Sequence, residues 1–353
     1  MSASVSPGPP RGDASFDMDL RAVLRGGNAQ TVGVFVALAA LVLFGLLRYE
    51  NFGSAYNIAS FLNYNSMFIL ISIGMCLVII TGGIDLSVGS VAAFSSVCAA
   101  YLSPHGLLVA LPGGVAAGLA FGALNAFVIL ALRVPPFIAT LATLLGAKGG
   151  SLVLSGAQTI SVDWSSDFTR LGMGKALDVV PWTILITLGV AVAAWVVLER
   201  SSLGRTLLAI GGGEEASMLM GLKVGRAKAF AYLFSGGCAG LAGVFLASGF
   251  GAGQPLEGVG WELSAIASVV VGGTLLTGGL GSITATVAGA LLLGLVFNIL
   301  NFENGRGTIS LSAYWQQVIR GAFLFLVILV QLRVARRRLS PGAGADPARG
   351  TRA

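Results

Sequence analysis

Long apolar stretches separated by short polar connections run through most of the chain, and this pattern predicts membrane-spanning helices. A helix needs about 20 mostly apolar residues to cross the bilayer core. The windows of suitable composition are 31–47, 58–80, 84–102, 107–132, 136–155, 179–198, 228–249, 262–276, 281–302 and 315–332. The pattern therefore predicts an all-α polytopic membrane protein with about ten transmembrane helices.

Three of these windows are short or crowded with glycine and polar residues. They are 84–102, 136–155 and 262–276. Irregular backbone is tolerated at membrane depth where protein, and not lipid, surrounds it. We therefore expect some of these three helices to be broken or re-entrant.

Composition agrees with a membrane protein. Of 353 residues, 55% are hydrophobic and 10% are charged, whereas soluble domains contain about 25% charged residues. Residues 31–332 are expected to form one transmembrane domain, followed by a basic cytoplasmic tail at 333–353. Residues 1–30 lack the apolar core of a cleavable signal peptide, so we expect a disordered cytoplasmic tail there.

The distribution of Lys and Arg predicts the orientation of the chain. With the N-terminus in the cytoplasm, fifteen of these residues fall in inner segments and five in outer segments. The connection 199–228 alone holds five of the inner ones. Cytoplasmic loops carry such an excess, so both termini are expected on the cytoplasmic side. The net charge of +6 then follows from topology, and it indicates no nucleic-acid partner.

One aspartate lies between two apolar windows, in the stretch TGGIDLSVGS at 81–90. An ionisable side chain near the bilayer interior usually faces a cavity or a partner. Asp85 and Ser87 also resemble a helix N-cap, which would hold the charge at the inner end of the next span. Both interpretations remain open from the residues alone: a cap, or a wall of a substrate path.

The other polar residues within the predicted spans are neutral amides and hydroxyls. Such groups suit an uncharged, hydroxyl-rich ligand, although hydrogen bonds between helices explain them equally well. An ion-coupled pump is disfavoured, because acidic and basic relays are nearly absent. The candidate substrate path consists of Asp85, Ser87, Asn63, Asn65, Asn125 and Thr140.

Motifs for chemistry are absent from the sequence. None of the four lysines belongs to a phosphate-binding G-x-x-x-x-G-K-[ST] loop. No nucleophile–base set appears, and Cys76, Cys98 and Cys238 have no metal-ligand spacing. We expect no catalytic residue, metal or cofactor in this chain. The glycine-rich stretches 118–122 and 236–243 instead predict close helix packing.

The connection 199–228 contains a predicted short helix on the cytoplasmic surface. Glu214 and Glu215 would favour its N-terminus, and Gly221 is placed to end it. A second large connection, 156–178, is expected outside. In addition, 78–91 resembles 274–287, which indicates either an internal duplication or coincidence in a glycine-rich chain.

Four stretches together resemble one family. They are ITGGIDLSVGSV at 80–91, ALRVPPFIATLAT at 131–143, GRTLLAIGGGEEASMLMGLKVGRAK at 204–228 and ELSAIASVVVGGTLLTGGLGS at 262–282. Their order and spacing are similar to the membrane permease of bacterial ribose, xylose and galactose-type ABC importers. The similarity extends from about residue 30 to residue 332.

This resemblance implies a monosaccharide permease in the bacterial inner membrane that works by alternating access. Its implied partners are a cytoplasmic double-cassette ATPase, a periplasmic sugar-binding protein and a second permease chain, the same or different. ATP and Mg²⁺ would bind the ATPase. The resemblance assigns coupling to the ATPase to Gly212, Glu214, Glu215, Ala216 and Gly221. This sequence has Gly213 where the family often has Asn, which would loosen the start of the helix.

Two alternatives remain from the sequence. A related permease would import another solute, such as a nucleoside, a branched-chain amino acid or a furanose-type signal. A secondary transporter would work without an ATPase. The ATPase-coupling loop at 199–228 and the scarcity of acidic residues in the predicted spans argue against it.

Overall fold

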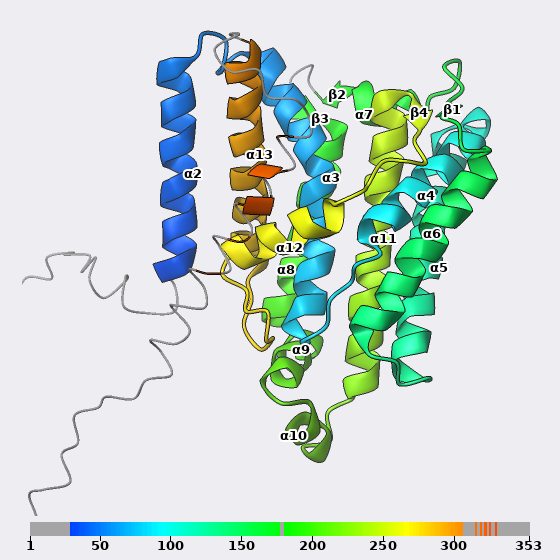
Figure 1. Ribbon diagram of the computed structural model, residues 1–353, viewed down its shortest axis with the longest axis vertical. Coiled ribbons are helices and arrows are strands. Elements are labelled where there is room, and N and C mark those ends of the chain that lie inside the picture. Colours follow the sequence, from blue (N-terminus) through cyan, green and yellow to red (C-terminus); the bar gives the residue numbers. More distant parts are fainter. Residues whose placement is uncertain are drawn as a thin grey trace, which may run out of the picture.

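The structure is a computed structural model that describes residues 29–176 and 180–305, with single residues between 315 and 329. It is a helical bundle (Figure 1). The tenth expected span, 315–332, lies largely outside the described residues. The N-terminal tail up to residue 28 and the tail 333–353 lie wholly outside them, as does Asp178 of the predicted outer connection.

Helices account for nearly all regular structure in the described residues. The long helices are α2 (Ala29–Arg48), α3 (Ala55–Ile80), α5 (Leu107–Leu130), α6 (Pro136–Ser155), α8 (Trp182–Arg200), α11 (Val224–Phe250) and α13 (Ile283–Gly305). The shorter ones are α4 (Val88–Leu102), η1 (Ser103–His105), α7 (Thr169–Met173), α9 (Ser202–Gly212), α10 (Glu214–Leu219) and α12 (Trp261–Val271).

Six of the described helices are long and apolar enough to cross a membrane. The predicted span 136–155 is a continuous helix, α6, so it is not one of the broken helices expected among the three weak spans. The other two weak spans are indeed short. Helix α4 has 15 residues and α12 has 11, or roughly 22 and 16 Å at 1.5 Å per residue, less than the bilayer core.

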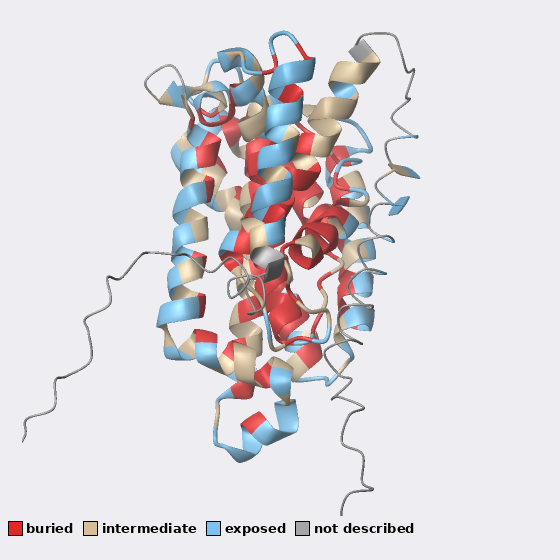
Figure 2. Cartoon of the chain, turned by 90° about the vertical axis from the view of Figure 1, so that its left-hand side faces the viewer, coloured by how far each residue is buried: buried red, intermediate tan, exposed pale blue. Residues whose placement is uncertain are grey.

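Helix α3 lies at the centre of the bundle. Within its apolar stretch 83% of residues are buried, compared with 22% in α5. Figure 2 shows buried residues gathered inside the bundle and exposed ones on its outer helices. The exposed side chains on α5, α6 and α8 include many large apolar ones, as expected of surfaces that contact lipid.

The glycine-rich stretches form the predicted close contact between helices. On α5 and α11, Gly118 faces Gly236 and Gly240, and a β-carbon added at Gly118 would lie 2.6 Å from the Gly240 Cα. A side chain at Gly118 would therefore force the two backbones apart. The expected packing role of 118–122 and 236–243 is confirmed.

The two large connections lie at opposite ends of the bundle (Figure 1). One end carries α7 and two short antiparallel pairs, in which β1 (Ile160–Ser161) pairs with β4 (Ala252–Gly253) and β2 (Lys175–Ala176) with β3 (Val180–Pro181). The other end carries α9 and α10. This separation agrees with the predicted outer position of 156–178 and inner position of 199–228.

Candidate functional site

Asp85 lies inside the protein, in an extended segment between α3 and α4. Helix α3 ends at Ile80 and α4 begins at Val88. Figure 1 shows the connecting segment returning from the lower end of α3 toward the middle of the bundle. There the first turn of α4 packs at Gly89 against Gly258, just before α12. Protein therefore encloses Asp85, and water does not hold its charge.

Serine hydroxyls and one backbone amide hold the Asp85 carboxylate. Its Oδ1 accepts bonds from the Ser87 backbone N–H at 3.0 Å and the Ser87 hydroxyl at 2.6 Å, and its Oδ2 accepts one from the Ser235 hydroxyl of α11 at 2.8 Å. The residue is 1% exposed. Ser87, the residue before α4, has helical backbone angles, and its own side chain makes no cap hydrogen bond. By accepting the Ser87 N–H, the Asp85 carboxylate holds the turn that leads into α4, and through Ser235 it also binds α11.

Two other predicted residues join this network. Asn125 of α5 donates through Nδ2 to the Ser87 hydroxyl at 3.0 Å. The Thr140 hydroxyl of α6 lies 3.2 Å from the Ile84 carbonyl, next to Asp85 in the chain, and 2.9 Å from the Pro136 carbonyl of its own helix, so the two carbonyls share this donor. The network therefore connects the 81–87 segment to α5, α6 and α11. A position within the protein interior explains why these polar side chains are tolerated at this depth.

The remaining predicted path residues lie elsewhere. Asn63 of α3 donates to the Gly172 carbonyl at 2.8 Å and accepts from the Thr183 hydroxyl at 2.7 Å. These bonds fasten α3 to α7 and α8, so Asn63 has a structural role. Asn65, two residues later, faces a different space and donates to the Phe61 carbonyl at 2.8 Å. The six predicted path residues thus form three separate groups.

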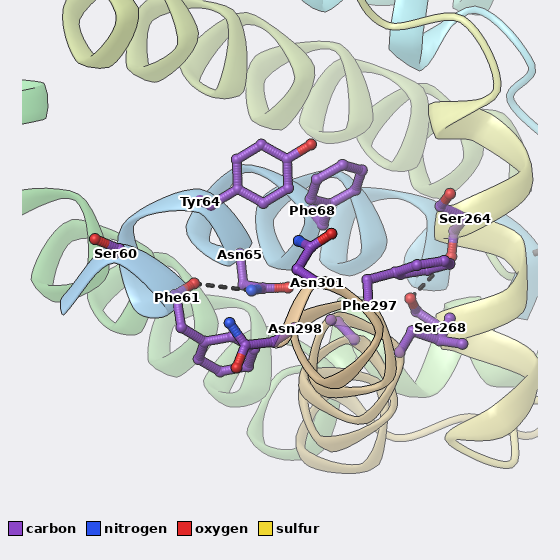
Figure 3. A pocket seen from close by; sticks show the side chains of 13 residues that line it. Ser60, Phe61, Tyr64, Asn65, Phe68, Ser264, Ser268, Phe297, Asn298 and Asn301 are labelled. Atoms are coloured by element: carbon purple, nitrogen blue, oxygen red, sulfur yellow. Dashed lines mark hydrogen bonds between the residues drawn. The ribbon is translucent and has the colours of Figure 1, made fainter. Parts of the chain in front are cut away.

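Asn65 lines a cavity of about 280 Å³ between α3, α12 and α13 (Figure 3). Its polar lining consists of two serines from α12, asparagines from α13, and Ser60 and Asn65 from α3. Aromatic rings and three small or aliphatic residues of α13 supply the rest. The lining residues are Ser60, Phe61, Tyr64, Asn65, Phe68, Ser264, Ser268, Ala290, Leu293, Gly294, Phe297, Asn298 and Asn301.

The chemistry of this lining favours a neutral polar ligand. No Asp, Glu, Lys or Arg occurs among the described residues around the cavity. Amide and hydroxyl groups donate and accept hydrogen bonds, and flat aromatic faces pack against apolar ring surfaces. Sequence reasoning pointed to the amides, but it missed Tyr64, Phe68 and Phe297. Their spacing is typical of ordinary core helices, so no sequence signal separates them from packing residues.

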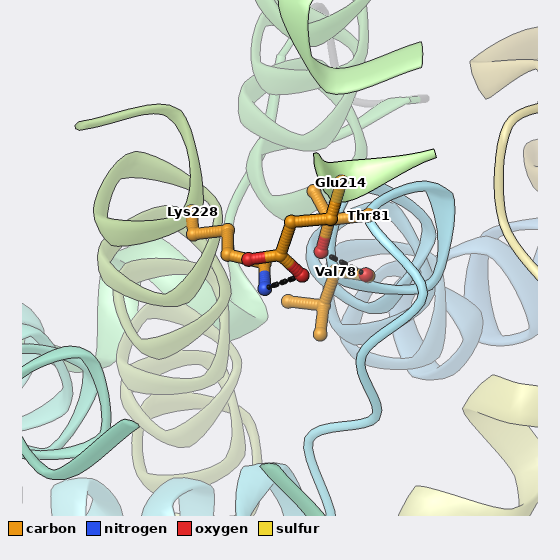
Figure 4. Close-up of polar contacts among 4 residues, drawn as sticks. All are labelled: Val78, Thr81, Glu214 and Lys228. Atoms are coloured by element: carbon orange, nitrogen blue, oxygen red, sulfur yellow. Dashed lines mark hydrogen bonds and ion pairs between the residues drawn. The ribbon is translucent and has the colours of Figure 1, made fainter. Parts of the chain in front are cut away.

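The predicted helix in the cytoplasmic connection is α10. It starts after Gly213, contains Glu214 and Glu215 in its first turn, and is followed by Gly221 with φ +78°. Glu214 Oε2 forms an ion pair with Lys228 Nζ of α11 at 2.6 Å, beside the C-terminal end of α3 (Figure 4). Glu214 therefore links α10 to α11, although it is exposed, as Glu215 is.

An apolar surface is exposed next to these carboxylates. Met218, Leu219 and Met220 are 53%, 89% and 68% exposed at the tip of the bundle. Gly212 and Ala216 are exposed as well. Exposed apolar clusters on a polar connection mark surfaces that bind another protein, and α10 presents one at its end.

Comparison with known proteins decides the family. The family described as the permease component of a branched-chain amino acid transport system matches residues 57–328. The chain belongs to this permease family. The permease is also 36% identical over 300 residues to the ribose import permease protein RbsC of Escherichia coli K12, covering 84% of this chain and 91% of that protein. The resemblance to carbohydrate importer permeases is confirmed.

Further relatives of the permease carry the names of sugar importers. The RbsC protein of Bacillus subtilis 168 is 35% identical over 307 residues, covering 86% of this chain and 93% of that protein. The D-allose transport system permease protein AlsC of Escherichia coli K12 is 34% identical over 308 residues, covering 86% and 92%. No solved structure matches the chain.

Proposed function

We propose that this protein is the membrane permease of an ABC importer that carries a monosaccharide across the bacterial inner membrane. Family membership and relatives named for ribose and allose import support this function. The observation that carries it in this chain is the uncharged cavity lined by amides, hydroxyls and aromatic rings. A sugar offers hydroxyl groups to such amides and an apolar ring face to such aromatics.

The family description leaves a branched-chain amino acid as a second candidate. A zwitterion carries two charges, and each is expensive to bury without a partner. The described lining of the cavity supplies neither a carboxylate nor a basic group. The cavity therefore favours the neutral ligand.

Transport by this permease requires partners that bind ATP and deliver the ligand. The exposed apolar tip of α10 is suited to a groove on a cytoplasmic ATPase with two nucleotide-binding cassettes, where ATP and Mg²⁺ would bind. A periplasmic sugar-binding protein would dock at the opposite end, and a second permease chain would complete the path. ATP binding would switch the permease between inward-open and outward-open states.

Uptake in reconstituted vesicles tests the function. The permease is assembled with a double-cassette ATPase and a sugar-binding protein, and radiolabelled D-ribose, D-allose, L-arabinose and L-leucine are supplied in turn. ATP-dependent uptake of a sugar, competed by unlabelled sugar and not by leucine, is expected. Uptake of leucine alone, or sugar uptake without the ATPase, would contradict the proposal.

A further inference from the structure

Three backbone segments meet without intervening side chains at the end of the bundle that carries α10. They are the end of α3 at Ile80 and Gly82, the end of α9 at Gly211, and the loop between α12 and α13 at Gly278 and Gly279. We name these five residues the glycine junction. Its members come from three regions distant in sequence. Gly82 belongs to the TGG motif at 81–83, and Gly278 and Gly279 belong to the similar TGG motif at 277–279.

Within the glycine junction, the contacts at Gly211 and Gly278 leave no room for a β-carbon. One added at Gly278 would lie 2.9 Å from the Gly82 nitrogen and the Ile80 oxygen, and 3.0 Å from the Gly211 Cα. One added at Gly211 would collide with the Gly279 nitrogen and the Ile80 oxygen. Glycine is therefore required for packing at these positions.

Backbone hydrogen bonds hold Gly82, Gly278 and Gly279 of the glycine junction in place. Gly279 donates to the Ile80 carbonyl at 3.0 Å, and this bond satisfies an otherwise unpaired acceptor at the end of α3. Gly82 donates to the Ile79 carbonyl at 2.8 Å and Gly278 to the Leu275 carbonyl at 3.0 Å. Side chains can absorb a displacement by changing rotamer, but a contact between hydrogen-bonded backbones cannot.

The position of the glycine junction relates α10 to the cavity. Gly211 lies three residues before Glu214, the first residue of α10. Ile80 ends α3, and the loop with Gly278 and Gly279 follows α12. Helices α3 and α12 both line the cavity, through Asn65 and Ser268 among others.

We propose that the glycine junction is a rigid joint that moves with α10 and passes its displacement to the cavity-lining helices α3 and α12. This inference rests on the proposed function, because it assigns the route by which the ATPase acts on the path. Gly211 is then a positioning residue that acts through Ile80 and Gly279 and touches no ligand.

The first test replaces Gly211 with alanine in the complete transporter. Uptake of the transported sugar is expected to fall about tenfold, while the variant still co-purifies with the ATPase and hydrolyses ATP at a rate near wild type. The control is Gly225→Ala near the start of α11, where an added β-carbon meets nothing within 4 Å. Wild-type uptake by Gly211→Ala would overturn the proposal.

A second test leaves the glycine junction unaltered, so it remains decisive if Gly211→Ala does not assemble. Spin labels are placed at Arg205 of α9 and Leu280 of the α12–α13 loop, both exposed, after Cys76, Cys98 and Cys238 have been replaced by alanine. A second pair joins Leu280 to exposed Leu132, in the turn after α5. Pulsed electron paramagnetic resonance compares the nucleotide-free and ATP-bound complexes.

A rigid joint predicts that the Arg205–Leu280 distance stays constant while the Leu280–Leu132 distance changes by about 2 Å or more. A changed Arg205–Leu280 distance would mean that the glycine junction deforms. If both distances stay constant, the junction passes no displacement from α10 to the cavity-lining helices. Either result overturns the proposal. The measurement needs ATP but no sugar, so it can fail while the proposed transport function stands.

Discussion

Asp85 and Ser235 lie 150 positions apart in the sequence and are joined by a 2.8 Å hydrogen bond in the interior of the bundle. The bond attaches the extended 81–87 segment to α11, the same helix whose Lys228 holds Glu214 of α10. One helix therefore contacts both the buried carboxylate and α10. The predictions below follow from these contacts and from the cavity.

Removing the Asp85 carboxylate should destabilise the permease. Asp85→Ala leaves the hydroxyls of Ser87 and Ser235 without their acceptor, and each unsatisfied buried group costs about 1–3 kcal/mol. Asp85→Asn keeps one acceptor oxygen and should cost less. Thermal unfolding of the purified variants in detergent measures the effect.

The chain offers a matched control in Asp163. Its Oδ1 accepts bonds from the Ser165 N–H at 2.8 Å and the Ser165 hydroxyl at 2.6 Å, which is the same local turn as that of Asp85 but in the outer connection. These bonds lower the pKa of Asp163. Asp163→Ala should change the unfolding temperature much less than Asp85→Ala. Equal shifts would show that the interior position of Asp85 contributes nothing.

Transport should also be more sensitive to Asp85→Asn than to Asn125→Ala. Asp85 binds α11 directly through Ser235, whereas Asn125 reaches the segment only through the Ser87 hydroxyl. Sugar uptake per assembled complex separates this effect from folding yield. Full uptake by Asp85→Asn would limit the carboxylate to a local structural role.

Reversing charge at Glu214 and Glu215 should uncouple ATP hydrolysis from transport without preventing membrane insertion. The Glu214–Lys228 pair allows the two roles to be distinguished, because exchanging the charges in Glu214→Lys/Lys228→Glu restores an ion pair. If Glu214 acts by positioning α10, the exchange should recover uptake that the single Glu214→Lys variant loses, by about tenfold.

The readouts for these variants are co-purification of the ATPase and uptake in vesicles. Failure of the exchanged pair to recover either one would mean that Glu214 contacts the ATPase directly. Glu215 is exposed and forms no ion pair within the described residues, so no exchange partner exists for it. The variant Glu215→Lys therefore serves as the comparison.

Changing the cavity lining should weaken ligand binding while leaving the ATPase attached. Asn65→Ala removes one amide from the lining, and Ser268→Leu fills part of the 280 Å³ space. Each should raise the KM for sugar uptake about tenfold, the effect of losing roughly 1.4 kcal/mol of binding. Ser72→Ala on α3, the helix of Asn65, is the control, because the buried Ser72 hydroxyl has no hydrogen-bond partner within the described residues. Unchanged KM in both lining variants would place the ligand elsewhere.

The close packing of α5 on α11 should make the stability of the permease sensitive to substitution at Gly118. Gly118→Ala should destabilise the permease by about 1–3 kcal/mol, because the added methyl group forces a shift of backbone and not of a side chain. At Gly146 of α6 an added β-carbon meets nothing within 4 Å. Gly146→Ala should be neutral or slightly stabilising, since alanine favours helix more than glycine. Thermal unfolding compares the two.

Much of the fold could be predicted because the hydrophobic pattern is local. Apolar length and the positions of Lys and Arg report which segments suit the bilayer and which suit water, and they need no knowledge of neighbours. In this way the sequence predicted the long helices, the short helix after Gly213 and close helix packing at 118–122 and 236–243. Pattern alone could not separate the continuous helix α6 from the short helices α4 and α12, since all three contain small and polar residues.

The environment of each polar side chain depended on tertiary structure. Asp85 and Asn65 both appear in the sequence as polar residues in or beside apolar spans. In the structure, Asp85 is buried against Ser235 of the distant helix α11, whereas Asn65 faces a cavity. The contact of Ile80, Gly211 and Gly278 also depends on tertiary structure, because these residues come from three segments distant in sequence. Hydrogen bonds and steric contacts act over a few ångströms, so only the folded chain decides which groups come within that range.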